Sequence, residues 1–265
     1  MLSKAKIRWV RSLSQKKVRE REGLFVAEGP KVVEEFIGAG LECVFLASVQ
    51  PAPFSQDIGR GELQVERVTP EELLRLSGQQ TPQGVVGVFR VPSLPRGTDG
   101  DCGLQGAAIL LDEVQDPGNV GTIIRLADWF GVEDVYLTGG CADAWSPKVV
   151  QASMGALARV RVHAPEEAGR VVRGFREAGR PVYATVLGGD NIYETELAGK
   201  EGLVVMGNEG RGIRPEVVAL CSHRLSIPSY PPGRPTSESL NVAMATGIIL
   251  SELRRRQMAS ACRAR

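Results

Sequence analysis

The feature that most constrains the fold is the regular alternation of short apolar runs and helical patterns after about residue 105. Strands are expected at 107–111, 134–138, 159–162, 182–186, 203–206 and 225–227, and helices at 122–130, 147–157, 166–178, 215–220 and 239–256. Strands that alternate with helices build a mostly parallel sheet covered on both faces, and such sheets bind ligands at the carboxyl ends of their strands. This region is therefore predicted to be an α/β domain with a ligand site at that edge.

A smaller α/β module is predicted ahead of this domain. Its expected helices are 30–36 and 70–76, each beginning at a proline, and its expected strands are 42–47, 63–68 and 84–91. The segment 92–103 is rich in proline, glycine and polar residues, which is typical of a linker. With 265 residues, 43% of them hydrophobic, the chain can bury a sizeable core. We predict two domains, 1–95 and 105–265, joined by a linker at 96–104.

The amino-terminal end of the chain is strongly basic. Residues 1–21 hold eight lysines and arginines against one acidic residue. The basic residues are Lys4, Lys6, Arg8, Arg11, Lys16, Lys17, Arg19 and Arg21. A local basic stripe is the usual footprint of phosphate binding, although the charges alone fit a solvated helix face equally well. A second basic cluster, at 254–256 with Arg263 and Arg265, is expected to cap the negative end of the last helix.

Several classes of protein are disfavoured. The five cysteines are scattered without a CxxC pair, so neither a disulfide framework nor a metal site is expected. No signal peptide and no run of 18 apolar residues occurs, which predicts a cytoplasmic protein that makes no membrane contact. His163 and His223 are expected to be surface or packing residues, which argues against a serine or cysteine hydrolase. Neither a P-loop nor the GxGxxG spacing is present.

Polar side chains gather where the predicted strands end. In DPGNVGTIIR (116–125), Asn119 lies at a helix entry and Arg125 follows about one and two-thirds turns later. Arg125 interrupts an apolar helix, so it requires either an ion pair with Asp128 or Asp112 or a substrate phosphate. Glu209 stands between glycines and Asn241 precedes the last helix. The simpler interpretation of Glu209 is that it caps the next turn, and that of Asn241 is that it caps the helix.

Three motifs in this order resemble those of the SpoU (TrmH-like) family of RNA ribose 2′-O-methyltransferases, in the SPOUT superfamily. They are DPGNVGTIIR (116–125), MGNEGRG (206–212), and IP (227–228) with SLN (239–241). The resemblance covers about residues 105–256. FVAEG (25–29) and TPQG (81–84) are similar, more weakly, to the ribosomal-protein-like α/β module that binds substrate in larger members. This similarity favours the RNA-docking interpretation of the basic stripe, from Lys4 to Arg19.

The resemblance implies a parallel sheet whose carboxyl-terminal segment threads through a loop to form a deep trefoil knot, an exception to the rule against knotted chains. It also implies that S-adenosylmethionine binds bent in the knot and that the protein is a homodimer. By motif matching, the cofactor contacts fall on Leu187, Gly188, Gly207, Ile227 and Leu240. Glycine permits close backbone approach, while the apolar side chains would cover the adenine.

The resemblance further implies that Arg125 is the catalytic arginine. A guanidinium stays protonated in proteins, so its role is left open between a clamp on the RNA phosphate and, when that phosphate polarises it, a proton acceptor. The residues expected to position Arg125, the ribose and the knot loops are Asn119, Glu209, Ser239 and Asn241.

The sequence departs from the family pattern in one loop, and it does not by itself identify the RNA substrate. The loop SYPPGRPTSE (229–238) is some four residues longer than is common in the family, and Arg234 within it is interpreted as a solvated charge. Large-subunit (23S) ribosomal RNA is favoured as the substrate by analogy with members that carry the extra module. A tRNA-directed enzyme and a non-catalytic RNA-binding or assembly factor remain alternatives.

Overall fold

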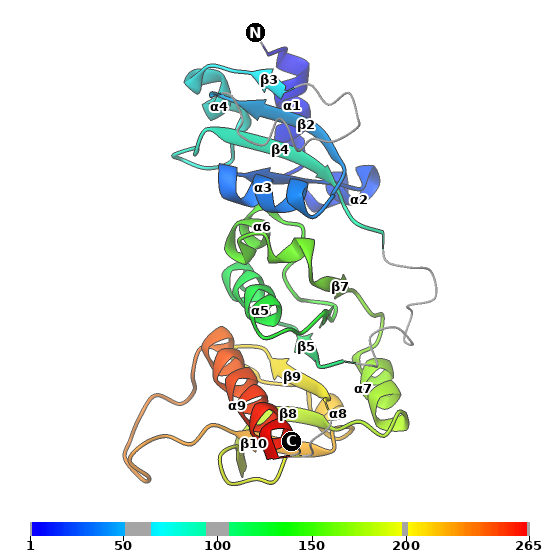
Figure 1. Cartoon of the computed structure of the whole chain (residues 1–265), viewed down its shortest axis with the longest axis vertical. Coiled ribbons are helices and arrows are strands. Elements are labelled where there is room, and N and C mark those ends of the chain that lie inside the picture. Colours follow the sequence, from blue (N-terminus) through cyan, green and yellow to red (C-terminus); the bar gives the residue numbers. More distant parts are fainter. Residues whose placement is uncertain (1, 51–64, 94–105, 198–200, 264–265) are drawn as a thin grey trace. The chain divides into compact units, whose positions relative to one another are not determined.

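A computed structural model describes residues 2–50, 65–93, 106–197 and 201–263 (Figure 1). The chain divides into two compact units. Unit 1 comprises Met1–Ser93 with Asp143–Arg159, and unit 2 comprises Leu94–Ala142 with Val160–Arg265. The predicted linker lies outside the described residues. Contacts group residues 143–159 with the amino-terminal unit, so the domain boundaries at 95 and 105 stay a prediction from sequence.

Unit 1 is built on a four-stranded sheet in the order β1-β4-β2-β3. The strands are β1 (Leu24–Glu28), β2 (Cys43–Ser48), β3 (Val65–Arg67) and β4 (Val85–Arg90). Strand β4 runs antiparallel to β1 and β2, whereas β2 and β3 are parallel. The helices are α1 (Lys4–Ser12), α2 (Lys16–Glu22), α3 (Pro30–Gly38), α4 (Pro70–Leu76) and α6 (Pro147–Ser153). The unit is the small α/β module that the sequence predicts, with two further helices and one further strand at its amino-terminal end.

The core of unit 1 explains why these elements pack together. The rings of Phe25, Phe36 and Phe89 are fully buried, and their centroids lie 5.2 to 5.8 Å apart. Helix α1 belongs to the packed structure, because Val10 and Leu13 are buried in the unit's hydrophobic cluster. The basic amino-terminal stripe is therefore presented by two docked helices.

Unit 2 contains a six-stranded sheet in the order β10-β8-β9-β5-β6-β7, and all described pairs are parallel. The strands are β5 (Ala108–Asp112), β6 (Asp134–Leu137), β7 (Arg161–His163), β8 (Val182–Asn191), β9 (Leu203–Gly207) and β10 (His223–Ser226). The helices are α5 (Pro117–Trp129), α7 (Ala168–Glu177), α8 (Pro215–Val218) and α9 (Val242–Arg263). The parallel α/β architecture predicted from the alternating pattern is confirmed.

Among the helix boundaries that differ from those expected, two have a clear local reason. Helix α5 begins at Pro117 and not near residue 122, because the Asp116 carboxylate accepts a hydrogen bond from the Asn119 amide (2.8 Å) and caps the first turn. The helix expected over 147–157 breaks after Ser153, where Met154 and Gly155 have φ of 52° and 92°. A left-handed residue ends a helix, so a short 3₁₀ turn follows instead.

The arginines at 254–256 lie within α9 and not at its end, so these three do not cap the last helix as expected, and the side chains of Arg263 and Arg265 lie outside the described part of the chain. Arg254 instead donates to the carbonyls of Phe130 (2.7 Å) and Gly131 (2.9 Å), which caps the carboxyl end of α5. Arg255 and Arg256 hydrogen-bond Glu252 and lower its pKa to about 2. Within the described residues, none of the helices combines the length and the apolar character needed to cross a lipid bilayer.

Candidate functional site

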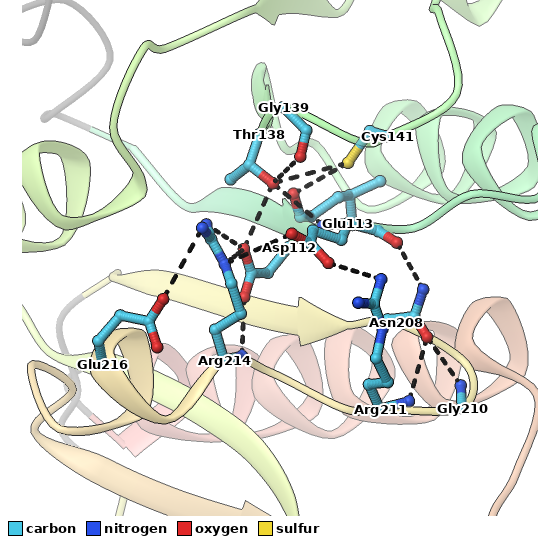
Figure 2. A network of polar contacts seen from close by, with 11 residues as sticks. Asp112, Glu113, Thr138, Gly139, Cys141, Asn208, Gly210, Arg211, Arg214 and Glu216 are labelled. Atoms are coloured by element: carbon cyan, nitrogen blue, oxygen red, sulfur yellow. Dashed lines mark hydrogen bonds and ion pairs between the residues drawn. The ribbon is translucent and has the colours of Figure 1, made fainter.

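The candidate site starts where β5 and β9 end. These strands are neighbours with Asp112 paired to Gly207, so the loops that leave them begin side by side. Asp112 is fully buried and accepts hydrogen bonds from the backbone and side chain of Arg214 (Figure 2). Strand ends in a parallel sheet are where α/β proteins bind ligands, as the sequence predicts for this edge.

The loop after β9 is folded back tightly on the strand. A Cβ at Gly207 would lie 2.3 Å from the carbonyl carbon of Gly212, so glycine is required there. Asn208 and Gly212 form an antiparallel bridge, and the Asn208 Oδ1 accepts from the amides of Gly210 (3.0 Å) and Arg211 (3.1 Å). This fold leaves Glu209 exposed between the two bridged residues.

A chain of side-chain hydrogen bonds joins three of the predicted site residues. The Asn119 Nδ2 donates to Glu209 Oε1, and the Asn241 Nδ2 donates to Asn119 Oδ1, both at 2.9 Å. Asn241 also accepts from the amides of Ala243 and Met244, so it caps α9 as well. Asn119, Glu209 and Asn241 come from the start of α5, the loop after β9 and the entry to α9. The structure therefore brings them together, as predicted.

Arg125 lies exposed on α5, whose opposite face is buried through Ile124 and Ala127. Asp112 is engaged by Arg214, so the expected ion-pair partner at 112 is not available to Arg125. Arg125 makes no hydrogen bond or ion pair with any residue that the structure describes. Its guanidinium is thus a solvent-facing positive charge on the helix that also carries Asn119.

The predicted cofactor residues lie on adjacent strands. Strand β8 bulges between Ala184 and Asp190, because these two residues pair with the consecutive residues Arg224 and Leu225 of β10. The bulge carries Leu187 (76% exposed) and Gly188 (φ 70°). Gly207 ends β9, and Ile227 directly follows β10. Three neighbouring strands, β10, β8 and β9, therefore each bring one of the predicted contact segments to the carboxyl edge.

The segment before α9 is more exposed to solvent than the other parts of the candidate site. Every residue from Pro228 to Asn241 is exposed, including Ser239 and Leu240, the latter at 50%. Ser239 makes no hydrogen bond with the described part of the chain, so it is not joined to the Asn119 chain. Arg234 is likewise exposed.

Two residues of the predicted RNA-binding stripe form ion pairs with other residues of unit 1. Arg19 is only 4% exposed, pairs with Asp143 and donates to the carbonyls of Leu13 and Ser14. It is therefore a structural residue, and its assignment to the RNA-binding surface is wrong. Lys6 is half-buried against Glu66 and lies over the Phe45 ring. The exposed members of the stripe are Lys4, Arg8, Arg11, Lys16 and Lys17.

Sequence reasoning missed Asp112, Glu113, Asn208, Arg211 and Arg214, which join the two loops in Figure 2. Their one available signal is position, since each follows or ends an apolar strand. The histidines pack as predicted: His163 is buried beside Asp134, and the His223 ring contacts that of Tyr183. Among the described residues, no group of histidine, cysteine and acidic side chains is arranged to hold a metal ion.

Fold and site together define an α/β protein whose parallel sheet gathers polar side chains and glycines at its carboxyl edge, where such sheets bind ligands, and which has a second, smaller α/β unit. The chain belongs to the SpoU rRNA Methylase family, whose model matches residues 106–251. Residues 4–87 match the MRM3-like substrate binding domain. Both resemblances seen in the sequence are confirmed.

Known proteins resemble the chain over nearly its whole length. The 23S rRNA (guanosine(2553)-2′-O)-methyltransferase of Bacillus subtilis is 29% identical over 94% of this chain and 96% of its own. A TrmH-family RNA methyltransferase of Porphyromonas gingivalis is 43% identical, with a TM-score of 0.84 over 97% and 99% of the two chains. The AdoMet-bound rRNA methyltransferase of Sinorhizobium meliloti is 32% identical, with a TM-score of 0.83 over 97% and 96%.

Proposed function

We propose that the protein methylates a ribose 2′-hydroxyl of ribosomal RNA, most specifically 23S ribosomal RNA, with S-adenosylmethionine as methyl donor. The observation that carries the proposal is the hydrogen-bonded chain of Glu209, Asn119 and Asn241. Its middle residue, Asn119, lies on the same helix as Arg125, which is exposed and has no partner among the described residues. The Bacillus subtilis relative acts on 23S ribosomal RNA and the Sinorhizobium meliloti relative binds AdoMet. Such a target places the activity in the cytoplasm.

The strand ends fit the proposed cofactor. Gly207 has no space for a side chain because the loop after β9 folds back on it, and Gly188 sits in a bulge with a left-handed φ that favours glycine. Leu187, Ile227 and Leu240 offer partly or largely exposed apolar side chains that would cover an adenine. When bound, S-adenosylmethionine supplies an electrophilic methyl group on a sulfonium.

In this reaction the protein's own residues orient the ribose 2′-hydroxyl and assist removal of its proton. Arg125 holds the phosphate next to the 2′-hydroxyl, because an exposed guanidinium that no described residue pairs with matches phosphate oxygens in charge and geometry. Proton acceptance by Arg125 is the competing role. Asn119, Glu209 and Asn241 fix the start of α5 and so the direction in which Arg125 projects, and Ser239 closes on the site from the exposed loop.

We also infer a trefoil knot. Strand β10 lies at the sheet edge beside β8, whereas α9 packs on α5, where Leu126 lies 3.5 Å from a Cβ placed at Gly247. Helix α5 directly follows β5, which lies beyond both β8 and β9. The chain between β10 and α9 thus returns across two strands, a route that supports threading through a loop.

We also propose that the protein is a homodimer. Helices α5 and α9 carry apolar side chains that face solvent, namely Trp129 (83% exposed), Met258 (71%) and Met244 (64%). Large exposed apolar side chains on two packed helices favour a subunit interface. Sedimentation velocity is expected to give the mass of a dimer, and the mass of a monomer at micromolar concentration would contradict it.

The reaction is tested by incubating the protein with tritiated S-adenosylmethionine and separate pools of unmodified ribosomal RNA and tRNA, followed by mapping of ribose methylation. Label on ribose in ribosomal RNA is the expected result. Label confined to tRNA would contradict the substrate, label on a base would contradict the reaction, and no label with intact RNA binding would favour a non-catalytic assembly factor.

The exposed part of the basic stripe is predicted to bind RNA phosphates. Replacing Lys4, Arg8, Arg11, Lys16 and Lys17 by glutamine should flatten the slope of log affinity against log salt, by about 0.7 to 0.9 for each phosphate that is no longer neutralised. The folded unit should persist, because these side chains are exposed. Filter binding of ribosomal RNA between 50 and 200 mM salt, roughly the range over which such slopes are measured, provides the test.

Arg19 is the matched comparison within the same stripe. Arg19→Met should lower the free energy of unfolding by about 3 kcal/mol, because it leaves Oδ2 of Asp143 and the carbonyls of Leu13 and Ser14 without the arginine donor. The salt slope of the folded variant should stay that of the wild type. If the slope of log affinity against log salt is unchanged in the glutamine variant, the stripe is only a solvated helix face and does not bind RNA.

A further inference from the structure

A buried ion pair lies at the junction of the two loops that build the site. Asp112, the last residue of β5, is 0% exposed. Its Oδ1 accepts from Arg214 Nε (2.9 Å) and Nη2 (2.7 Å), and its Oδ2 accepts from the Arg214 amide (2.9 Å). Both carboxylate oxygens thus bind Arg214 of the neighbouring loop, and Oδ1 also accepts from Thr138 Oγ1 (3.3 Å). This pairing raises the pKa of the Arg214 guanidinium above its ordinary value.

The next residue, Glu113, is also held by the opposite loop. Its φ of 59° is left-handed, a conformation that a non-glycine residue keeps only where its surroundings enforce it. The Asn208 Nδ2 donates to its carbonyl and Arg211 Nη2 donates to its carboxylate, both at 2.8 Å. Its own amide donates to Thr138 Oγ1 at 3.0 Å (Figure 2). The turn after β5 is therefore fixed by contacts with the loop after β9.

These contacts fix the loop after β9 on both sides of Glu209. Asn208 anchors the residue before it, while Arg211 and Arg214 anchor the residues after it. Glu209 in turn accepts the hydrogen bond that orients the Asn119 amide. The Asp112 pair is thus connected to Glu209 and Asn119 through the loop after β9 that it anchors.

We propose that Asp112 and Arg214 are positioning residues for methyl transfer, which hold Gly207 and Glu209 where the cofactor and the Asn119 chain require them. This role rests on the proposed function, because it assigns the loop after β9 to cofactor binding. The competing explanation is that the pair stabilises the fold without any effect on the site.

The chain offers a matched pair at the other edge of the same sheet. Asp134 is 2% exposed and accepts from Arg161 Nε (2.8 Å) and Nη2 (2.7 Å). The Arg161 side chain is 40% exposed, close to 38% for Arg214. Asp134 and Arg161 are the first residues of β6 and β7, so they lie at the amino ends of parallel strands, away from the site loops.

The test compares Arg214→Met with Arg161→Met in the full chain. Isothermal titration with S-adenosylmethionine and steady-state methyl transfer give the cofactor affinity, KM and kcat, and thermal unfolding gives stability. Both variants should unfold at lower temperature than the wild type. Arg214→Met should lose about 10- to 100-fold in cofactor affinity, as is typical when an outer partner of a binding group is removed, whereas Arg161→Met should stay within about two-fold.

Arg214→Lys keeps the charge but not the paired donors, so partial recovery of affinity is expected. This variant also keeps the test decisive if Arg214→Met fails to fold. Equal cofactor affinity and kcat in the Arg214 and Arg161 variants would overturn the positioning role. A wild-type protein that does not bind S-adenosylmethionine would instead overturn the proposed function, and the positioning role with it.

Discussion

Replacing Arg125 by alanine is expected to reduce methyl transfer by about 10³-fold or more while leaving the affinity for S-adenosylmethionine within about two-fold of wild type. The guanidinium is exposed on α5 and makes no hydrogen bond or ion pair with other described residues, so its removal breaks no polar contact of the described fold. The predicted cofactor contacts lie instead on β8, β9 and the segments after β10. Loss of a positioned charge should therefore appear in kcat and in RNA affinity, not in cofactor affinity.

Single-turnover methyl transfer with saturating RNA, together with isothermal titration of S-adenosylmethionine, separates these effects. Arg170→Ala is the matched control, because Arg170 is also an exposed arginine on a helix, α7, of the same unit. It should retain full activity. Arg125→Lys should recover part of the phosphate contact but not its two-pronged geometry. Equal loss of methyl transfer and cofactor binding in Arg125→Ala would make Arg125 a structural residue.

The layout of unit 2 could be predicted because local signals and tertiary packing agree there. Strands such as β5 are continuous apolar runs, which is what burial on both faces of a parallel sheet requires. Hydrophobic periodicity places the onset of α5 too late, because Asp116 and Pro117 start the helix by capping before the periodic apolar residues begin. Periodicity therefore locates an element better than it locates its ends.

Part of the site could be predicted for a different reason. Asn119, Glu209 and Asn241 are polar residues at strand ends or helix entries, where the backbone has to turn, and their motifs occur in a fixed order. The pair of Asp112 and Arg214 could not be predicted, because its partners are 102 positions apart in the sequence. The charge pattern assigns Arg19 to the surface because its partner Asp143 is 124 positions away. Charge patterns indicate where ions occur, but only the folded chain decides which of them are neutralised.

Gly207 defines the second large effect. Gly207→Ala is expected to lower the affinity for S-adenosylmethionine by about 100-fold or more, because displacement of a binding loop by about 1 Å has an effect of that size. The added Cβ would meet the Gly212 carbonyl carbon and the Ile213 nitrogen at 2.3 Å, and both are backbone atoms that cannot rotate away. The loop must shift, which should also lower the free energy of unfolding by about 1 to 3 kcal/mol.

Gly210 lies three residues further along the same loop and provides the control. A Cβ there would have Asn208 Oδ1 as its nearest neighbour at 3.7 Å, which is ordinary van der Waals contact. Gly210→Ala should therefore change stability by less than about 0.5 kcal/mol and leave cofactor affinity near that of wild type. Titration calorimetry and thermal unfolding of the two variants make the comparison. If Gly207→Ala binds the cofactor as tightly as Gly210→Ala, the end of β9 is not part of the cofactor site, and the contacts must be sought on the bulge of β8 and the segment after β10.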